Sequence, residues 1–229
     1  MKSKTLARLI GTVFVLIICE VFALLGLKIV QPHWQQDWRF QAISYEELVK
    51  EKTYMVNTLL AEDQNHRGYI RLDADLGWSV NSNGVALKPY DDPDPELYRA
   101  NGQGIRSSHE YQREPANDVV RVAVFGDSFT HADDVQNDLA WTTIWEKSHS
   151  NIEVLNFGVP GYGTDQAYLR YQKHGKAFSP DIAVLGIMSE NLNRNLNHFI
   201  PFYRHDAWPN SKPRFEFAPD GTFTLRENV

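Results

Sequence analysis

The amino-acid sequence predicts a three-layer α/β fold built on a doubly wound parallel sheet. Three apolar, β-branched stretches predict strands at residues 119–125, 152–157 and 181–187. Two stretches with helical spacing, residues 139–145 and 164–178, separate these strands. Strands that alternate with helices through short links form parallel βαβ units. Because the strands are apolar almost throughout, we expect both faces of the sheet to be covered.

The composition is that of a folded, acidic protein. Of 229 residues, 42% are hydrophobic and 12% aromatic, which is enough for a real core and argues against global disorder. A net charge of −6 disfavours a nucleic-acid binder, which needs a basic face. Cys19 is the single cysteine, so an internal disulfide and a multi-cysteine zinc site are excluded. We expect no cofactor and no metal.

The N-terminus predicts a membrane anchor within residues 1–30. A basic leader precedes an apolar run over residues 9–27, which is broken only by Glu20. Such a run roughly spans the ~30 Å hydrocarbon layer as a helix. The basic leader should stay in the cytoplasm and place the rest of the chain outside it, in the periplasm. Glu20 costs on the order of 2.5–3.5 kcal/mol at mid-bilayer unless it is protonated or pairs with a neighbouring helix.

A cleaved signal peptide is the alternative interpretation of the same segment. Val21-Phe22-Ala23 is a tolerable cleavage site with a small final residue. We favour the anchor because apolar residues continue through Leu27. A buried helix of a soluble protein is a third possibility, which the basic leader disfavours.

Two further regions precede the predicted sheet. Residues 31–66 predict a juxtamembrane amphipathic helix or stalk, with a capping box formed by Ser44 and Glu47. Residues 67–118 are polar and rich in turn-forming residues, so we predict an irregular lead-in with a few short strands. Residues 119–229 then form the main domain.

Ser128 follows the first predicted strand in the sequence Gly126-Asp127-Ser128. In open parallel sheets the ligand lies at the carboxyl ends of the strands. A serine at a helix start beyond a buried strand exposes its hydroxyl and leaves its own N–H free, and the helix N-terminus favours developing negative charge. Gly126 allows the sharp turn, and Asp127 is a candidate helix cap. The plainer interpretation is that Ser128 is itself only a capping serine.

The loops after the next two strands carry further candidates. Gly161, in the loop after residue 157, would let a backbone N–H approach a substrate closely. Asn191 stands in the loop after residue 187, which is rich in amide side chains. The plainer interpretations are an ordinary strand-to-helix turn and a capped, polar helix start.

Together and in this order, the three loops resemble the blocks of the SGNH (GDSL-like) hydrolase superfamily. Further stretches are similar to a bacterial envelope branch of that superfamily, and the resemblance extends from Leu76 to Val229. These stretches are Leu76-Gly77-Trp78, Asn101-Gly102-Gln103-Gly104-Ile105-Arg106, Arg121, Lys212-Pro213-Arg214-Phe215 and Asp220-Gly221.

The resemblance implies a catalytic site. Ser128 would be the nucleophile, and its N–H, the N–H of Gly161 and the side chain of Asn191 would form the oxyanion hole. The implied activity is an ester hydrolase or O-acyltransferase, with acetyl as the expected acyl group. The substrate would be an acylated small molecule or an envelope or exported glycan. The alternative is a catalytically inactive envelope scaffold or glycan-binding protein with the same fold.

Two departures from the superfamily pattern bear on the site. The third block usually reads Asn-Asp, whereas this chain has Glu190-Asn191, so Asn193 and Asn195 remain alternatives to Asn191. An Asp-x-x-His block, which would supply the general base, does not occur after Ser128; the one such sequence ends at His66, before it. We therefore expect the sheet to be incomplete in this chain, the base to lie in a segment beyond it, and this chain to be inactive without that segment.

His131 lies three residues after Ser128 and is an obvious alternative base. A base must reach the serine oxygen while a third group orients it, and a neighbour on the same helical turn rarely has that freedom. We predict that His131 lies at the surface or lines a pocket. His131 with Asp133 and Asp134 would suit a metal, but an exposed acidic loop is the better interpretation.

Overall fold

The computed structural model describes the chain in separate stretches, namely residues 16, 18–22, 24, 25, 44, 46, 47, 49, 50, 53, 54, 57, 68–88, 96–199 and 211–228. The described residues between 16 and 25 and between 46 and 57 are helical. Among the described residues, no helix combines the length and apolar character needed to cross a bilayer. Most of the predicted anchor and of the predicted 31–66 helix falls outside these residues.

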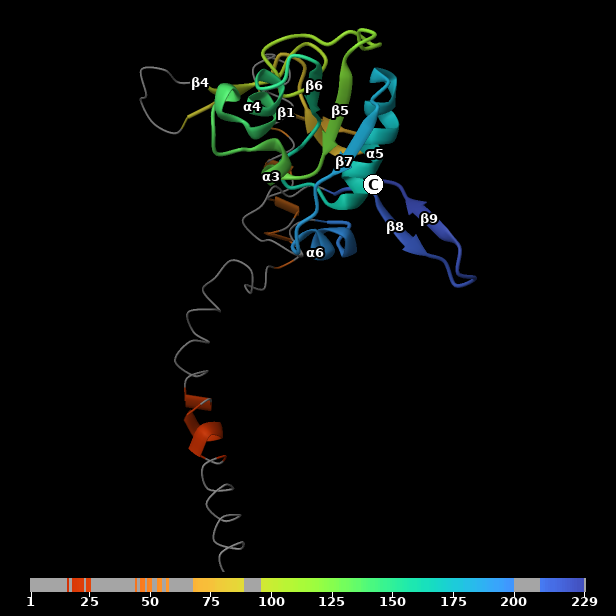
Figure 1. Ribbon diagram of the computed structural model, residues 1–229. Coiled ribbons are helices and arrows are strands. Elements are labelled where there is room, and N and C mark those ends of the chain that lie inside the picture. Colours follow the sequence, from red (N-terminus) through yellow and green to blue (C-terminus); the bar gives the residue numbers. More distant parts are fainter. Residues whose placement is uncertain are drawn as a thin grey trace, which may run out of the picture.

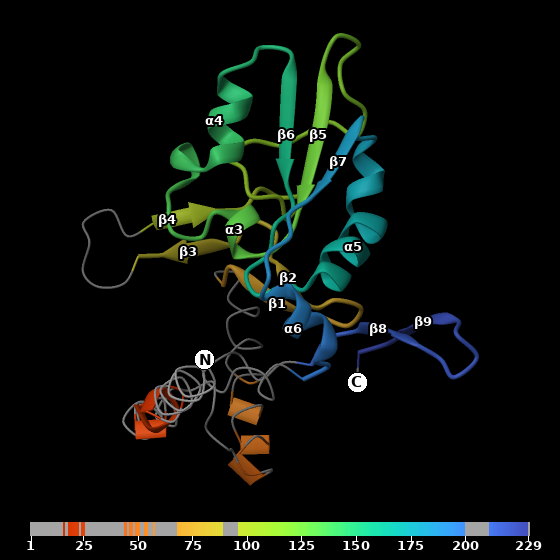
Figure 2. The same cartoon turned by 60° about the horizontal axis from the view of Figure 1, so that its bottom comes forward.

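Three parallel strands form the predicted sheet. They are β5 (Val120–Phe125), β6 (Ile152–Asn156) and β7 (Ile182–Leu185), and their order is β6-β5-β7 (Figure 2). Val122 pairs with Val154 on one side and with Ile182 on the other. The prediction of a mixed α/β fold with a three-stranded parallel sheet is therefore confirmed.

Helices cover both faces of this sheet. On one face α4 (Trp141–Lys147) packs with Trp145 against a cluster of Val122, Val124 and Val154. On the other face α5 (Thr164–Lys173) packs against the larger core. Successive residues of β5 thus pack into different layers, because side chains alternate between the two faces of a strand.

Both helices differ from their predicted bounds. A 3₁₀ turn, η2 (Asn137–Leu139), precedes α4, and the extended backbone of Ala140 separates the two. Another 3₁₀ turn, η3 (Gly175–Phe178), follows α5 and completes the stretch predicted to end at residue 178. The apolar periodicity therefore located the buried segments but not the breaks within them.

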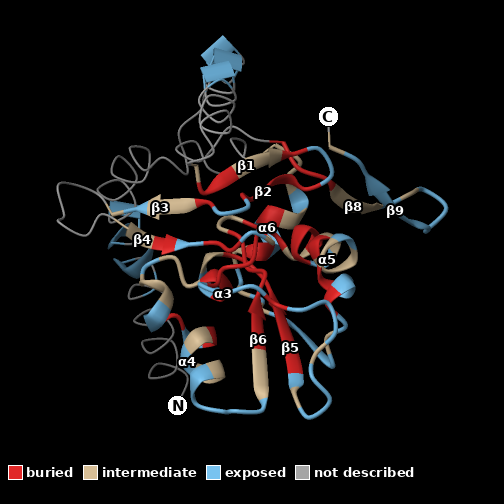
Figure 3. Ribbon diagram, turned by 90° about the horizontal axis from the view of Figure 1, so that it is seen from above, coloured by how far each residue is buried: buried red, intermediate tan, exposed pale blue. Residues whose placement is uncertain are grey.

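The lead-in belongs to the hydrophobic core rather than lying outside it. Its strands form two antiparallel pairs: β1 (Ile70–Asp73) with β2 (Gly77–Val80), and β3 (Val85–Leu87) with β4 (Glu96–Arg99). Buried residues concentrate along β5, at the carboxyl end of β6, in α5 and in β1 and β2 (Figure 3).

Hydrogen bonds fasten the lead-in to the loop and helix that follow β6. Trp78 Nε1 donates to Pro160 O over 2.9 Å, and Tyr162 Oη donates to Trp78 O over 2.6 Å. Arg170 Nη1 in α5 donates to Ser79 Oγ over 2.5 Å. The first two bonds hold the segment around Gly161 in place.

The C-terminal part consists of α6 (Asn191–Leu196) and an antiparallel hairpin of β8 (Arg214–Phe217) and β9 (Phe223–Arg226). The hairpin projects from the body of the protein (Figure 1). A buried ion pair between Lys212 and Asp165 fastens its base to α5.

Strand β7 corrects one prediction. All four of its residues are exposed, Ile182 by 49% and Leu185 by 42%. The expectation that every apolar strand is covered on both faces is therefore wrong for this edge strand. The reason is positional: within the described stretches β7 pairs with β5 on one side only, and α4 packs over β6.

Candidate active site

Ser128 begins the short helix α3 (Ser128–His131) directly beyond the carboxyl end of β5. The cap of this helix is Asp127, whose Oδ1 accepts the N–H of Phe129 over 3.0 Å. The predicted role of Asp127 is thus confirmed, and Ser128 is not the capping residue. The Ser128 side chain is half-buried, and its hydroxyl is left for other chemistry.

The glycine loop after β6 runs beside the serine loop. The N–H of Val159 donates to Gly126 O over 3.0 Å. Gly158 makes this approach possible, because a Cβ there would lie 2.5 Å from the backbone N of His131. A side chain at residue 158 would therefore separate the two loops.

Gly161 and Ser128 both offer backbone donors. Gly161 has a φ of +78°, a left-handed conformation that favours glycine. Within the described stretches, neither the N–H of Gly161 nor that of Ser128 donates to an acceptor of the protein. Unpaired backbone N–H groups of this kind are what an oxyanion hole requires.

Asn191 is buried, with 2% of its surface exposed, and it already has partners. Its Nδ2 donates to Asp127 Oδ2 over 3.0 Å and to Tyr162 O over 3.1 Å. Its Oδ1 accepts the N–H of Met188 over 2.7 Å. Asn191 thus joins all three loops, but both of its amide hydrogens are used in doing so. An oxyanion donor role requires one of them to be released.

The alternatives to Asn191 lie elsewhere. Asn193 is exposed on α6. Asn195 faces α5, where its Oδ1 accepts the N–H of Thr164 over 2.9 Å. Of the three amides, only Asn191 contacts the serine loop among the described residues.

Sequence reasoning missed Arg194. Its Nη1 donates to Asp127 Oδ2 and to Tyr162 O, both over 3.1 Å, and all three residues are buried. The available signal was the spacing of three between Asn191 and Arg194, which puts both on one helix face. A buried arginine on the capping carboxylate fixes α6 against the serine loop.

The structure corrects the prediction for His131. Its side chain is fully buried rather than at the surface or in a pocket. Tyr69 Oη is hydrogen-bonded to its Nε2, and Asp133 Oδ1 lies 2.5 Å from its Nδ1. Its two ring nitrogens are therefore engaged away from Ser128. Among the described residues no group of histidine, cysteine and acidic side chains is arranged to hold a metal.

Burial lowers the pKa of His131 to about 4 from its ordinary 6.5, which predicts an acid-sensitive fold. The unfolded chain takes up the proton near pH 6.5, and the folded protein only near pH 4. The stability contributed by neutral His131 is therefore complete above about pH 6.5 and lost as the pH falls toward 4, by up to about 3 kcal/mol. Burial lowers the pKa of His174 to about 4 as well, so it shares this window.

Urea unfolding at pH 7 and pH 4.5 measures this effect. We expect His131→Gln to lose less stability between the two pH values than the wild type does, and His174→Gln serves as the comparison. An unchanged pH dependence in His131→Gln would show that His131 is not protonated on unfolding.

A pocket of about 410 Å³ opens beside Ser128. It is lined by Ser128, Phe129, Ala132, Asp133, Asp134 and Val135. Within the described part of the chain, no basic side chain is hydrogen-bonded to Ser128 Oγ. Among the described residues, the site therefore presents a half-buried serine and backbone donors, and no side chain placed to act as a base on Ser128.

The sequence matches no protein-family model, and no curated protein shows significant similarity to it.

Proposed function

We propose that this chain is a serine-dependent ester hydrolase or O-acyltransferase of the SGNH type, with Ser128 as the nucleophile. The observations that support it are a helix-initial serine at the end of β5 and, among the described residues, two backbone N–H groups without a protein acceptor, those of Ser128 and Gly161. The order β6-β5-β7 is compatible with this fold. The proposed substrate is an acylated small molecule or an exported glycan with acetyl esters.

In the proposed reaction, Ser128 Oγ attacks the ester carbonyl and gives its proton to a base. The resulting oxyanion accepts hydrogen bonds from the N–H groups of Ser128 and Gly161, and the loss of one such donor typically costs about 10²–10³-fold in rate. The alcohol leaves with the proton, and an acyl-serine remains. Water or a sugar hydroxyl then takes the acyl group.

The proposal sets two requirements. The base must come from outside the described residues, since none of these reaches Ser128 Oγ. Asn191 must either release a hydrogen from Asp127 or Tyr162, or act only by holding the loops together.

A fluorophosphonate probe tests the proposal on the full-length protein in detergent, in a form that includes the segment supplying the base. The probe phosphonylates an activated serine, so we expect stoichiometric labelling that peptide mapping assigns to Ser128. Release of p-nitrophenol from its acetyl ester without an acceptor would favour the hydrolase, and release only with a sugar acceptor would favour the transferase. Labelling of a serine other than Ser128 would refute the assignment.

An inactive scaffold or glycan-binding protein is the second candidate. It is favoured by the engagement of both Asn191 amide hydrogens and by the missing base at Ser128 among the described residues. Absence of probe labelling together with calorimetric binding of an acetylated oligosaccharide would select this function.

The proposal also places the domain outside the cytoplasm, held by the N-terminal segment. An alkaline phosphatase fused after Val229, which is active only when exported, should be active. Activity of a cytoplasmic reporter at the same position would reverse this topology.

A further inference from the structure

Arg106 is a lead-in residue that lies against the carboxyl end of α3, and its side chain is buried with 3% exposed. Its guanidinium donates to three backbone carbonyls of one segment: His131 O, Ala132 O over 2.5 Å, and Val135 O over 2.6 Å. The guanidinium also lies over the ring of Tyr98, 4.7 Å from its centroid. One side chain therefore satisfies the carbonyls of the last residue of α3, of its C-cap Ala132 and of Val135 in the segment that follows.

Helix α3 depends on such contacts because it is a single turn. A helix of four residues does not persist by itself, since nucleation is costly and only one or two internal hydrogen bonds form. Asp127 caps its N-terminus, and Thr130 O accepts hydrogen bonds from Asn156 and Trp141. The next two carbonyls, those of His131 and Ala132, accept hydrogen bonds from Arg106.

His131, the last residue of α3, anchors the same turn beside Arg106. Its ring packs edge-on against the rings of Tyr69 and Tyr98, at centroid distances of 5.3 and 4.9 Å. Both tyrosines belong to the lead-in, as does Arg106. The lead-in thus supplies the side chains against which α3 packs.

We infer that Arg106 is a positioning residue for Ser128: by holding the carboxyl end of α3 it fixes the N–H and the hydroxyl of the first residue of that helix. The inference rests on the proposed function for its catalytic consequence. Lysine keeps the charge but presents one ammonium in place of a planar fork, so it cannot reach all three carbonyls.

Arg106→Lys tests this with two independent measurements. Amide hydrogen exchange reports on the bonds from His131 N to Asp127 O and from Ala132 N to Ser128 O. We expect these amides to exchange at least about tenfold faster, because losing a charge-assisted hydrogen bond shifts a local opening equilibrium by that much. Fluorophosphonate labelling of Ser128 should slow by about 100-fold, the cost of a displacement on the order of 1 Å.

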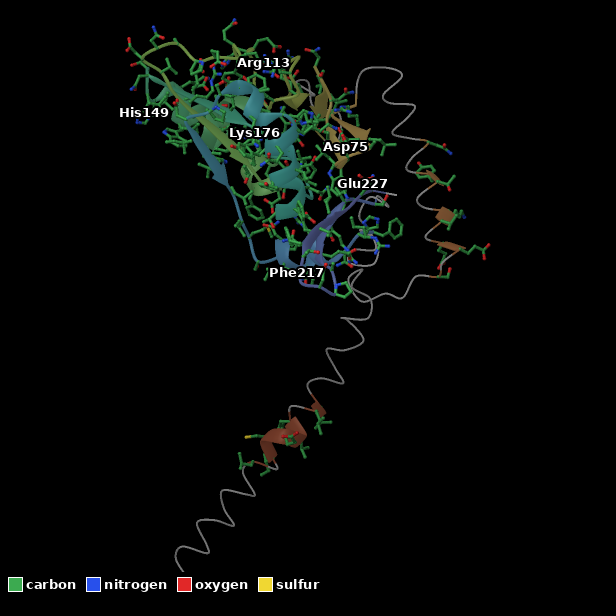
Figure 4. The ribbon with its side chains drawn as sticks, turned by 90° about the vertical axis from the view of Figure 1, so that its right-hand side faces the viewer. Asp75, Arg113, His149, Lys176, Phe217 and Glu227 are labelled. Atoms are coloured by element: carbon green, nitrogen blue, oxygen red, sulfur yellow. The ribbon has the colours of Figure 1, made fainter. Side chains whose placement is uncertain are left out.

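Arg121→Lys is the matched control. Arg121 is also fully buried and also donates to backbone carbonyls, Arg113 O over 2.9 Å and Phe178 O over 2.6 Å. It lies at the opposite end of β5, and Figure 4 shows Arg113 at the end of the domain remote from Phe217. This variant should lower the melting temperature and leave the labelling rate within about twofold of the wild type.

The outcomes separate the two proposals. Wild-type rates of exchange and labelling in Arg106→Lys would overturn the positioning role, as would equal loss of labelling in Arg121→Lys at equal loss of stability. If the wild type is not labelled, the proposed function fails, while the exchange measurement still decides the role of Arg106. If Arg106→Lys does not fold, hydrogen exchange of the wild-type protein tests the positioning role instead. The role requires the amides of α3 to exchange as slowly as those of β5, and faster exchange would overturn it.

Discussion

Ser128→Ala is expected to abolish probe labelling and to lower ester hydrolysis by about 10⁴–10⁶-fold, the range seen when a nucleophile is removed from serine hydrolases. Stability should change by less than about 0.5 kcal/mol, because the substitution removes one half-buried hydroxyl and no core volume. The Asp127 cap and the Arg106 contacts of α3 involve other atoms and remain. The initial rate of p-nitrophenyl acetate hydrolysis and the melting temperature measure both effects.

Ser189→Ala is the control for Ser128→Ala. Ser189 lies exposed in the loop after β7, at the same edge of the sheet, and belongs to no part of the proposed site. It should keep wild-type labelling and hydrolysis. Full hydrolysis by Ser128→Ala would show that the reaction uses another nucleophile.

Lys212→Met is expected to lower the free energy of unfolding by about 3–5 kcal/mol, the usual cost of leaving one partner of a buried ion pair alone. Lys212 is 0% exposed, and its Nζ contacts Asp165 Oδ2 and donates to Pro213 O over 3.1 Å. Burial raises the pKa of Asp165 and lowers the pKa of Lys212, so each charge is costly without the other. Urea unfolding followed by tryptophan fluorescence gives the change.

Two further variants make this test specific. Lys212→Met combined with Asp165→Asn should recover much of the loss, because no uncompensated charge remains buried. Lys147→Met breaks an exposed pair with Asp138, which is worth less than about 1 kcal/mol. A loss below about 1 kcal/mol in Lys212→Met would show that the variant does not hold an uncompensated charge at Asp165, because the carboxyl either takes up a proton or is reached by water.

The sheet could be predicted because its strands are local in sequence. Residues 119–125 and 152–157 each bracket the observed strand to within one residue, since a buried strand is a continuous apolar run. The exposure of β7 was not predictable in the same way. An apolar composition indicates that a strand can be buried on both faces. Whether it is buried depends on which other helices and strands pack against it.

In the candidate site, only the positions in the loops directly after the strands were predictable from the sequence. Ser128 and Gly161 follow from where β5 and β6 end. The partners of Asn191 depend on how α6 docks on Asp127, which no local pattern encodes. His131 was misplaced for a related reason: Tyr69, 62 residues earlier in the chain, covers it.

The bonds between the lead-in and the α5 region also constrain how the chain acquires its fold. Trp78 and Pro160 are 82 residues apart, Leu76 and Gln166 are 90, and Ser79 and Arg170 are 91. Contacts between residues so far apart in the sequence form only after the chain has lost the entropy of closing a long loop. Such contacts therefore slow folding. During synthesis, β1 and β2 emerge from the ribosome well before their partners and must wait, with Leu76 and Trp78 uncovered, until α5 has been made.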